Sequence, residues 1–306
     1  MSTFYTCVDR YSNDILFRGY KDGKPISERI QYKPTMYIPG KADSPYKTLE
    51  GKSVEPVNPG TMRDTRNFID EYKHVDNFKI YGNTNYIHQF ISDAFLKRGV
   101  NFDRDKINVT TIDIEVQSDQ GFPTPDEARF PITAITVKNN IDNKFYVWGL
   151  GEWKDHRSEL KKELVDRVVY VQCDKEAGLL MKFLDHWCKN YPDVLTGWNS
   201  RLFDTTYIVN RIAMILGEDM QKKLSPWKII NERNIDIAGR KHQAFDIYGL
   251  QQLDYMDCFK KFGYTYGTQE SYKLDNIAHV VLGERTLSYD AYGSLHALYN
   301  QNHQKF

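Results

Sequence analysis

The stretch Val109-Thr110-Thr111-Ile112-Asp113-Ile114-Glu115-Val116 decides how this chain is interpreted. Its β-branched and apolar residues predict a strand beside a core. Side chains two apart on a strand point to the same face, so Asp113 and Glu115 are expected side by side. Two partly buried like charges are costly unless a cation lies between them. The pair therefore predicts a divalent-metal site of the kind used in phosphodiester chemistry.

The bulk composition places few limits on function. A length of 306 residues suggests two domains, and 41% hydrophobic with 27% charged residues is typical of a globular protein. Lys plus Arg and Asp plus Glu number 41 each, so the net charge does not indicate a polyanionic partner. A nucleic-acid site would have to be a local patch assisted by metal ions.

The cysteines and the N-terminus exclude several classes of protein. No C-x-x-C pair occurs among Cys7, Cys173, Cys188 and Cys258, which argues against zinc, and four scattered thiols are typical of a reduced cytosolic protein. The first residues lack the basic and apolar regions of a signal peptide. No stretch reaches the length of a membrane span, so no membrane partner is expected.

Residues 1–105 are predicted to form a smaller, β-rich α+β domain. Phe4–Val8 alternates like a strand, and Asp22-Gly23 indicates a hairpin between residues 15–20 and a run around 29–32. Residues 40–60 contain several prolines and glycines and are predicted to be a loop. Helices are expected over 61–72 and 85–95.

Residues 106–306 are predicted to form an α/β domain. Strands are expected at 107–116, 132–137 and 145–150, the first three sequential and antiparallel, with further strands at 168–171 and 194–198. A charged amphipathic segment at 157–164 and helices over 174–189, with an aspartate N-cap, and 203–216 complete the pattern. Such a mixed sheet with helices resembles the ribonuclease H-like architecture.

A second stretch, Leu195-Thr196-Gly197-Trp198-Asn199-Ser200-Arg201-Leu202-Phe203-Asp204, leads from a buried strand to a helix start. Alone, Asp204 is interpreted as a helix N-cap, because capping and the helix dipole both favour aspartate there. Beside a sheet that carries Asp113 and Glu115, its carboxylate can instead complete a metal site.

These two motifs together resemble a known family. Asp-Ile-Glu on a strand, followed by Gly-Trp-Asn-x-x-x-Phe-Asp, is similar to the Exo I and Exo II motifs of the 3′–5′ exonuclease domain of family B DNA polymerases, in particular the replicative polymerases of T-even-type bacteriophages. The resemblance extends over the whole chain. It includes Tyr32-Lys33-Pro34 in the N-terminal domain and, within the exonuclease domain, the stretches 119–125, 253–262 and 271–275.

The resemblance implies a proofreading reaction with two divalent cations, Mg²⁺ or Mn²⁺. Asp113 would bridge both ions, Glu115 would bind one and orient the attacking water, and Asp204 would bind the other. Three further residues would contact the substrate: Phe122, Asn199 and Phe203. The alternatives are a loop anchor for Phe122 and a turn residue for Asn199.

The resemblance also implies the partners. They are the 3′ end of single-stranded DNA, a primer-template and a C-terminal polymerase polypeptide, with RNA as a further candidate. The place of action would be the cytoplasm of an infected bacterial host.

One departure from the family pattern limits the prediction. The family's third motif is a tyrosine four residues before a final aspartate, and here Tyr299 is followed by His303. We expect the missing pair to come from a C-terminal segment or partner, so that the exonuclease domain lacks its C-terminal end. The alternatives are a non-catalytic nucleic-acid-binding or scaffold module of a split polymerase, and a free-standing exonuclease with His303 as a ligand. Asp254, Asp257 and Asp275 are predicted to be structural, Asp275 as the cap of a helix over 276–282.

Overall fold

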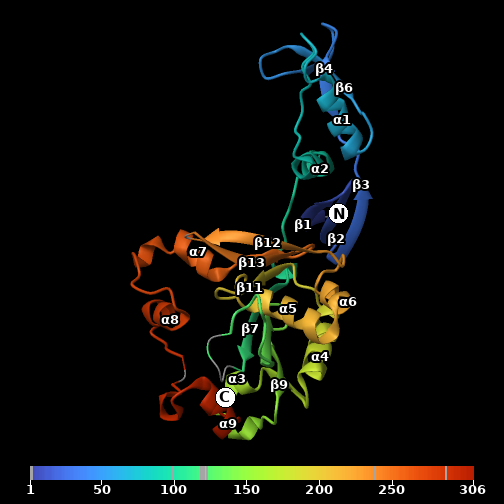
Figure 1. Cartoon of the computed structure of the whole chain (residues 1–306). Helices are drawn as coiled ribbons and strands as arrows, with labels where there is room; N and C mark the ends of the chain where they lie inside the picture. Colours follow the sequence, from blue (N-terminus) through green and yellow to red (C-terminus); the bar gives the residue numbers. More distant parts are fainter. Residues whose placement is uncertain (1–2, 98, 118–120, 122, 238, 287) are drawn as a thin grey trace. The chain divides into compact units, whose positions relative to one another are not determined.

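The computed structural model of the chain describes residues 3–97, 99–117, 121, 123–237, 239–286 and 288–306 (Figure 1). It divides into a first unit, Met1–Arg104, and a second unit, Asp105–Phe306. Each unit has its own cluster of buried hydrophobic side chains. Together they give a mixed α/β protein with a β-rich N-terminal region, as predicted.

The first unit contains two small antiparallel sheets and two helices. The order of the first sheet is β1-β2-β3 and that of the second is β4-β6-β5. The elements are β1 (Thr3–Tyr11), β2 (Asp14–Lys21), β3 (Lys24–Gln31), β4 (Met36–Pro39), β5 (Tyr46–Lys47), β6 (Ser53–Val57), α1 (Met62–Tyr72) and α2 (Tyr86–Phe95).

The hairpin prediction in this unit is confirmed, and the loop prediction is partly wrong. Lys21 pairs with Lys24 around a two-residue turn, where Asp22 and Gly23 have φ of 51° and 75°, as a primed hairpin turn requires. The 40–60 segment, however, contains β5 and β6. β6 accommodates Pro56 because β5 pairs only with Ser53 and Val54, so at Pro56 β6 has a neighbouring strand, β4, on one side only.

The second unit is built on a six-stranded mixed sheet of order β10-β9-β8-β7-β11-β14. β7, β8 and β9 are sequential and antiparallel, as predicted. β10 pairs in parallel with β9, and β11 pairs in parallel with both β7 and β14. The strands are β7 (Val109–Val116), β8 (Ile132–Asn139), β9 (Phe145–Leu150), β10 (Val168–Cys173), β11 (Val194–Thr196) and β14 (Gln251–Gln252).

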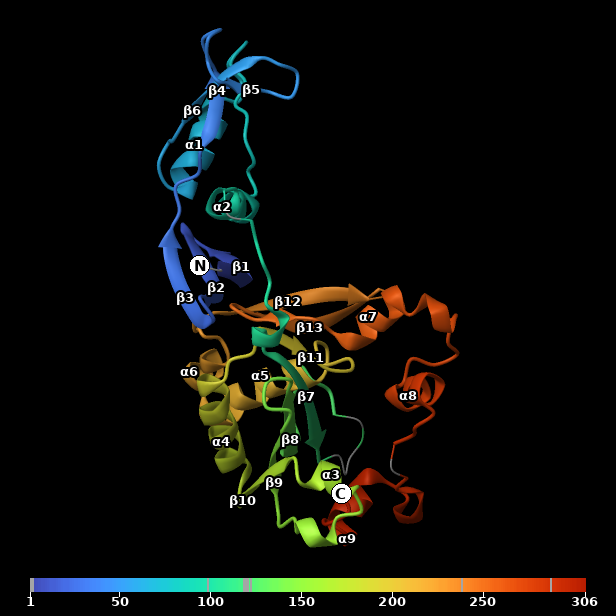
Figure 2. The ribbon, with the colours of Figure 1, turned by 180° about the vertical axis from the view of Figure 1, so that it is seen from behind.

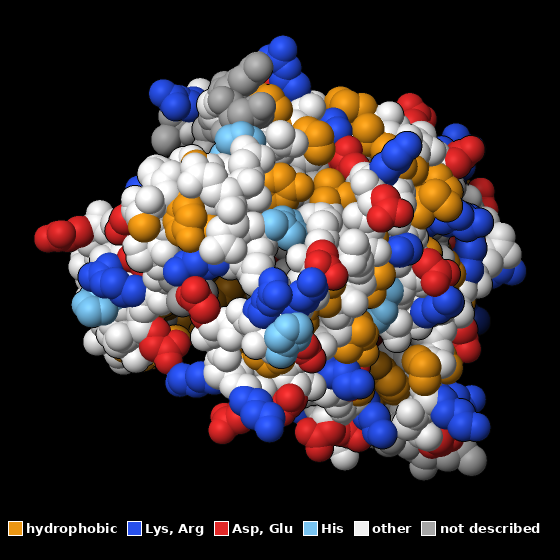
Figure 3. Space-filling model, turned by 90° about the horizontal axis from the view of Figure 1, so that it is seen from below, with side chains coloured by type: hydrophobic (Ala, Val, Ile, Leu, Met, Phe, Trp, Pro, Cys, Tyr) orange, Lys and Arg blue, Asp and Glu red, His pale blue; other side chains and the backbone are white. Residues whose placement is uncertain are grey.

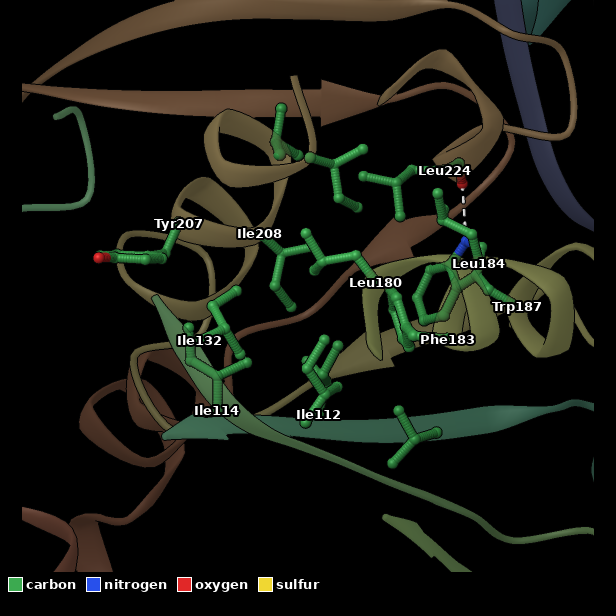
Figure 4. Close-up of a cluster of buried hydrophobic side chains, with 14 of the residues drawn as sticks. Ile112, Ile114, Ile132, Leu180, Phe183, Leu184, Trp187, Tyr207, Ile208 and Leu224 are labelled. Atoms are coloured by element: carbon green, nitrogen blue, oxygen red, sulfur yellow. Dashed lines mark hydrogen bonds between the residues drawn. The ribbon is translucent and has the colours of Figure 1, made fainter. Parts of the chain in front are cut away.

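Helices α4 (Glu176–Lys189) and α5 (Asp204–Leu216) pack on one side of this sheet (Figures 1 and 2). Figure 4 shows their apolar side chains meeting those of β7, and the Trp187 indole N–H donates to the carbonyl of Leu224 at 2.9 Å. The core residues labelled there are Ile112, Ile114, Ile132, Leu180, Phe183, Leu184, Trp187, Tyr207, Ile208 and Leu224.

The remaining elements include one hairpin that the sequence analysis did not predict, β12 (Ile230–Ile237) with β13 (Arg240–Ile247). The other helices are α3 (Lys162–Val165), α6 (Glu218–Gln221), α7 (Tyr255–Phe262), α8 (Leu274–Leu282) and α9 (Leu295–Gln301). The 3₁₀ turns are η1 (Arg104–Lys106), η2 (Asp155–Arg157), η3 (Lys222–Leu224), η4 (Tyr264–Tyr266) and η5 (Asp290–Tyr292).

Two predicted helix caps are wrong. α4 begins after Lys175, which provides no side-chain cap, so Asp174 does not cap it. Asp275 lies inside the first turn of α8 rather than at its N-cap. There its carboxylate accepts from the amide and hydroxyl of Thr286 and pairs with Arg285 at 2.8 Å, which ties α8 to the segment that follows.

The surface carries both signs of charge. On the face seen in Figure 3, basic and acidic side chains are interspersed, in keeping with the zero net charge. The four cysteines are thiols and not disulfides. None of the helices in the described ranges is long and apolar enough to cross a membrane.

Candidate active site

Asp113 and Glu115 lie on β7, on the face of the sheet opposite to the core. Ile112 and Ile114 alternate with them and are buried at 3% and 6% exposure. The side chains therefore separate as the strand period predicts, with two isoleucines facing α4 and α5 and two carboxylates facing away. The ladder with β8 is regular up to Glu115, where a bulge before Val116 alters the register.

Asp204 joins this pair from α5. β11 ends at Thr196, which is paired with Thr111, so β7 extends past its neighbour. The Ile114 amide, between the two acidic residues, donates to Asp204 Oδ1 at 3.0 Å. Asp204 is the first residue of α5 and is 4% exposed, and Phe203 occupies the N-cap position. The capping interpretation of Asp204 is therefore wrong.

The three carboxyl groups share one electrostatic environment. Burial, followed by the charge of Asp113, raises the pKa of Asp204 to about 8, although the Ile114 amide opposes the shift. Burial and then Asp113 raise the pKa of Glu115 to about 7. Burial also raises the pKa of Asp113, whose side chain reaches solvent but lies in a pocket surrounded by protein. Concentrating negative charge here is thus unfavourable in the protein alone.

The donor chemistry fits a hard divalent cation, because all three groups supply carboxylate oxygens. No Lys, Arg or His of the described chain forms an ion pair with them. The side chains are not assembled into a cage, however. Within the described ranges, no three His, Cys, Asp or Glu groups converge as a metal site.

The loop between β11 and α5 is fixed by close packing and by Asp254. A Cβ on Gly197 would lie 2.7 Å from the Ile112 carbonyl oxygen, so only glycine allows this approach to β7. The amides of Asn199 and Arg201 donate to the two carboxylate oxygens of Asp254 at 3.0 and 3.1 Å. Asp254 also caps α7, which makes it structural, as predicted.

The three predicted substrate-binding residues have different outcomes. Phe122 lies outside the described residues. Asn199 has a φ of 60°, so it occupies the left-handed turn conformation that asparagine tolerates well, and its backbone carbonyl accepts from the Phe203 amide. Phe203 packs against the core, with its ring 5.9 Å from that of Tyr207. Contact of Asn199 and Phe203 with substrate stays a prediction.

A pocket of about 260 Å³ opens on the carboxylate face of the sheet. Asp113 and Glu115 line it together with residues of β8, β9, β10, the 153–160 segment and residues 303–306. Gln304 exchanges two hydrogen bonds with the backbone of Lys154, and Lys305 pairs with Glu159 at 3.1 Å. His303 therefore lies in the same pocket as the acidic pair, where burial lowers its pKa.

Sequence reasoning missed a buried clamp behind Asp204. Arg211, two helical turns along α5, forms a bidentate pair with Glu176 of α4, both bonds at 2.7 Å and both side chains about nine-tenths buried. Arg211 also donates to the carbonyls of Ala128 and Arg129, and Glu176 accepts from the Ile132 amide. Asp204, Tyr207 and Arg211 are spaced three and four residues apart, which places them on one face of a helix. This spacing was the sequence signal that could have pointed to the clamp.

This clamp holds a strained turn. Ala128 is fully buried and has a φ of 42°, a conformation that costs energy for any residue with a Cβ. Tyr207 supports the same segment, since its hydroxyl donates to the Phe130 carbonyl at 2.7 Å and accepts from the Phe130 amide at 2.9 Å. The start of β8 is thus fixed against the helix that carries Asp204.

Comparisons with known proteins agree with the motifs. Residues 66–277 match the family model described as DNA polymerase family B, exonuclease domain. The chain is 32% identical over its whole length to the DNA-directed DNA polymerases of Escherichia phage RB69 and Enterobacteria phage T4. It is also 29% identical, over 46% of its length, to a DNA polymerase catalytic subunit of Psittacid herpesvirus 1. The chain spans 35% of the length of the two phage relatives.

Proposed function

Because the chain belongs to the exonuclease-domain family of family B DNA polymerases, we propose that its second unit is a 3′–5′ proofreading exonuclease. The observation that carries this proposal is the position of Asp204, whose carboxylate bonds to the backbone between Asp113 and Glu115. Three raised carboxyl pKa values at one point of a sheet support a shared task for these residues. We assign this unit the ribonuclease H-like architecture.

We propose that Asp113, Glu115 and Asp204 would hold two divalent cations, Mg²⁺ or Mn²⁺. Bound ions would supply charge neutralisation at the phosphorus and a more acidic water. Burial raises the pKa of Glu115 in the protein alone, whereas a bound cation would keep it ionised, and its carboxylate would accept a hydrogen bond from the attacking water. The water oxygen would bond to phosphorus while the water gives up a proton to solvent, the bond from phosphorus to the 3′-oxygen of the preceding nucleotide would break, and that oxygen would take up a proton.

We assign Phe122, Asn199 and Phe203 to the terminal nucleotide. Asn199 and Phe203 both follow Gly197 in the loop that ends at Asp204, so they lie beside the proposed metal ligands in sequence and in the fold. A substrate bound there would be a single strand, because the reacting 3′ end must leave its partner strand to approach a carboxylate pocket.

We propose further that this chain works as the N-terminal part of a phage replicative polymerase. Residues 1–105 would be the N-terminal domain, residues 106–306 the exonuclease domain, and a C-terminal polymerase polypeptide would bind the primer-template. That polypeptide would also supply the tyrosine and aspartate of the third motif. The location would be the cytoplasm of an infected bacterium, and RNA binding stays a prediction.

The test is a nuclease assay with 5′-labelled single-stranded DNA in Mg²⁺ or Mn²⁺. We expect shortening from the 3′ end by single nucleotides, faster when a C-terminal polymerase polypeptide is added, and abolished by EDTA or by Asp113→Ala. If Asp113→Ala leaves the rate of the combined proteins unchanged, the site assignment is wrong.

One observation favours a second function, a non-catalytic nucleic-acid-binding or scaffold module. The described carboxylates are not assembled into a metal cage. If the chain binds single strands in EDTA but does not cut them in Mn²⁺, even with a polymerase polypeptide present, this second function is the correct one. Cutting by the chain alone that is lost on His303→Ala would instead point to His303 as a ligand.

A further inference from the structure

We propose that Asn210 is a positioning residue for the exonuclease reaction, an inference that rests on the proposed function. Asn210 lies on α5, the helix that begins at Asp204, and its side-chain amide nitrogen donates two hydrogen bonds. One goes to the backbone carbonyl of Pro125 at 2.9 Å, and the other goes to Oε1 of Gln243, on β13, at 2.7 Å. A single side chain thus joins the helix that carries a proposed metal ligand, the segment between β7 and β8, and the β12–β13 hairpin.

The chemistry of the two partners fixes the orientation of this amide. A backbone carbonyl can only accept, so the Asn210 atom that faces Pro125 must be the nitrogen. The two acceptors then use both hydrogens of the amide group, and Gln243 must present its oxygen. Gln243 is itself held against α5, because its backbone carbonyl accepts from the Thr206 hydroxyl at 3.4 Å. One helix therefore holds two separate segments through a fully used pair of donors.

One face of α5 binds both ends of the 125–130 segment. Asn210 holds the start of the segment at Pro125. The Tyr207 hydroxyl holds its end, through hydrogen bonds with the amide and the carbonyl of Phe130. Asp204, Tyr207 and Asn210 recur at intervals of three residues, which brings them to neighbouring positions on the helix surface. The segment is thereby fixed relative to the Asp204 carboxylate.

The segment borders the candidate site because it belongs to the connection that leaves β7 directly after the acidic pair. β7 ends at Val116, the residue that follows Glu115. The Gln117 amide then donates to the Pro131 carbonyl at 3.0 Å, which closes the base of the connection to β8. The 125–130 segment therefore lies at the same end of β7 as the three carboxyl groups. A strand end that brings its phosphate to these carboxylates must pass beside it.

The start of the segment depends on Asn210 more than its end does. Proline has no amide N–H, so the carbonyl is the one backbone group through which Pro125 can be held. Without the Asn210 donors the start of the segment is released while Tyr207 still binds its end. Part of the molecules would then hold the segment out of place. The apparent affinity for the strand end falls in proportion to that part, and the chemical step in a correctly bound complex is unchanged.

The first measurement is the steady-state kinetics of cutting 5′-labelled single-stranded DNA in Mn²⁺ by the whole chain combined with a C-terminal polymerase polypeptide. We expect Asn210→Leu to raise KM about five- to tenfold and to keep kcat within about twofold of the parent value. Gln243→Met removes one acceptor and should raise KM about threefold, whereas Gln243→Glu keeps an acceptor oxygen and should restore the parent KM. The double variant Asn210→Leu with Gln243→Met should resemble Asn210→Leu alone, because both changes remove the same bond.

The second measurement is amide hydrogen exchange of the whole chain in EDTA, followed by mass spectrometry, which needs no nuclease activity. We expect Asn210→Leu to accelerate exchange over residues 124–130 at least about threefold and to leave exchange in α4 at the parent rate. Gln243→Glu should leave both regions unchanged. A general loss of stability would accelerate exchange in both regions, so the comparison separates local release of the segment from global destabilisation.

The matched control is Asn190→Leu. Asn190 also donates a side-chain hydrogen bond to a carbonyl, that of His186 at 3.0 Å, but it lies at the C-terminal end of α4. It should change neither KM nor exchange over residues 124–130. An active parent whose KM is unaltered by Asn210→Leu, or equal effects of Gln243→Glu and Gln243→Met, would overturn the positioning role and leave the proposed function intact. A parent protein that cuts no strand contradicts the proposed function, and the positioning role with it.

Discussion

At the scale of single residues, the candidate site depends on carboxylates that the protein holds against their own electrostatics. Asp204 is the extreme case, since its pKa rises to about 8 through burial and the charges of Asp113 and Glu115. Its Oδ1 accepts a hydrogen bond from the backbone amide of Ile114 in β7. Structural needs alone would be met by an uncharged acceptor at this position.

The first prediction concerns the pH dependence of stability without metal. The unfolded carboxyl titrates near 4 and the folded one near 8, so the folded state keeps a proton that the unfolded chain releases. Stability contributed by protonated Asp204 is therefore lost as the pH rises from about 4 to about 8. Asp204→Asn keeps the oxygen acceptor and removes the charge. In EDTA we expect it to raise the melting temperature at pH 8 more than at pH 5; equal shifts would contradict the raised pKa.

The second prediction concerns the buried clamp. Arg211→Met leaves the Glu176 carboxylate without its partner, which typically costs about 3–5 kcal/mol. Denaturant unfolding should show this loss. The double variant Arg211→Met with Glu176→Leu should recover much of it, because no isolated charge remains. A single variant as stable as the parent would show that the pair does not hold the 128–132 turn.

At the scale of elements, the decisive contact is that between β7 and the loop after β11. Gly197 permits it because its Cα hydrogen faces the Ile112 carbonyl, where a methyl group would collide. The loop then reaches Asp254, and α5 begins with its acidic residue turned towards β7.

The third prediction follows from this contact. Gly197→Ala should destabilise the chain by about 1–3 kcal/mol, because either β7 or the loop must move. Gly178→Ala is the control, since a Cβ there meets nothing within 4 Å and the residue lies inside α4. It should stabilise by about 0.5–1 kcal/mol. Comparable effects of the two substitutions would argue against a close approach at Gly197.

The elements that sequence predicted well are those with a strong hydrophobic period. The strands β7, β8 and β9 and the helix α5 follow from buried alternation and from apolar residues at helical spacing. The β12–β13 hairpin was missed because five of the eight residues of β12 are polar and the strand has no fully buried position, so its apolar pattern is weak. The β5–β6 pairing was missed because the strands are two and five residues long and lie among prolines.

The residues of the candidate site, too, could be predicted only where the sequence signal is local. Asp113 and Glu115 could be placed on one face because the strand period is local. Partnerships between distant elements could not be predicted from sequence, as with Arg211 and Glu176 or Gln304 and Lys154. These contacts depend on how α5, α4 and the C-terminal residues pack, which no local pattern encodes.

At the scale of the whole molecule, the two units have separate cores. The first core includes Phe90 and Phe95, and the second includes Phe183 and Trp187. Separate cores allow each unit to unfold as its own cooperative step.

The fourth prediction follows from these separate cores. Phe183→Ala should cost about 3–5 kcal/mol in the second unit, and Phe90→Ala should destabilise the first. Scanning calorimetry should then show that each variant lowers a different transition. A single transition that both variants lower equally would mean that the units unfold together.

Whether Asp113, Glu115 and Asp204 form one cation site is tested most directly by calorimetric titration of Mn²⁺ into the whole chain at pH 8. We expect binding with release of protons, because groups with pKa values of about 7 and 8 must ionise to become ligands. Asp113→Asn should weaken this binding at least about tenfold, or 1.4 kcal/mol, whereas the exposed control Asp257→Asn should not change it. Equal Mn²⁺ binding by the parent chain and Asp113→Asn would contradict a shared metal site.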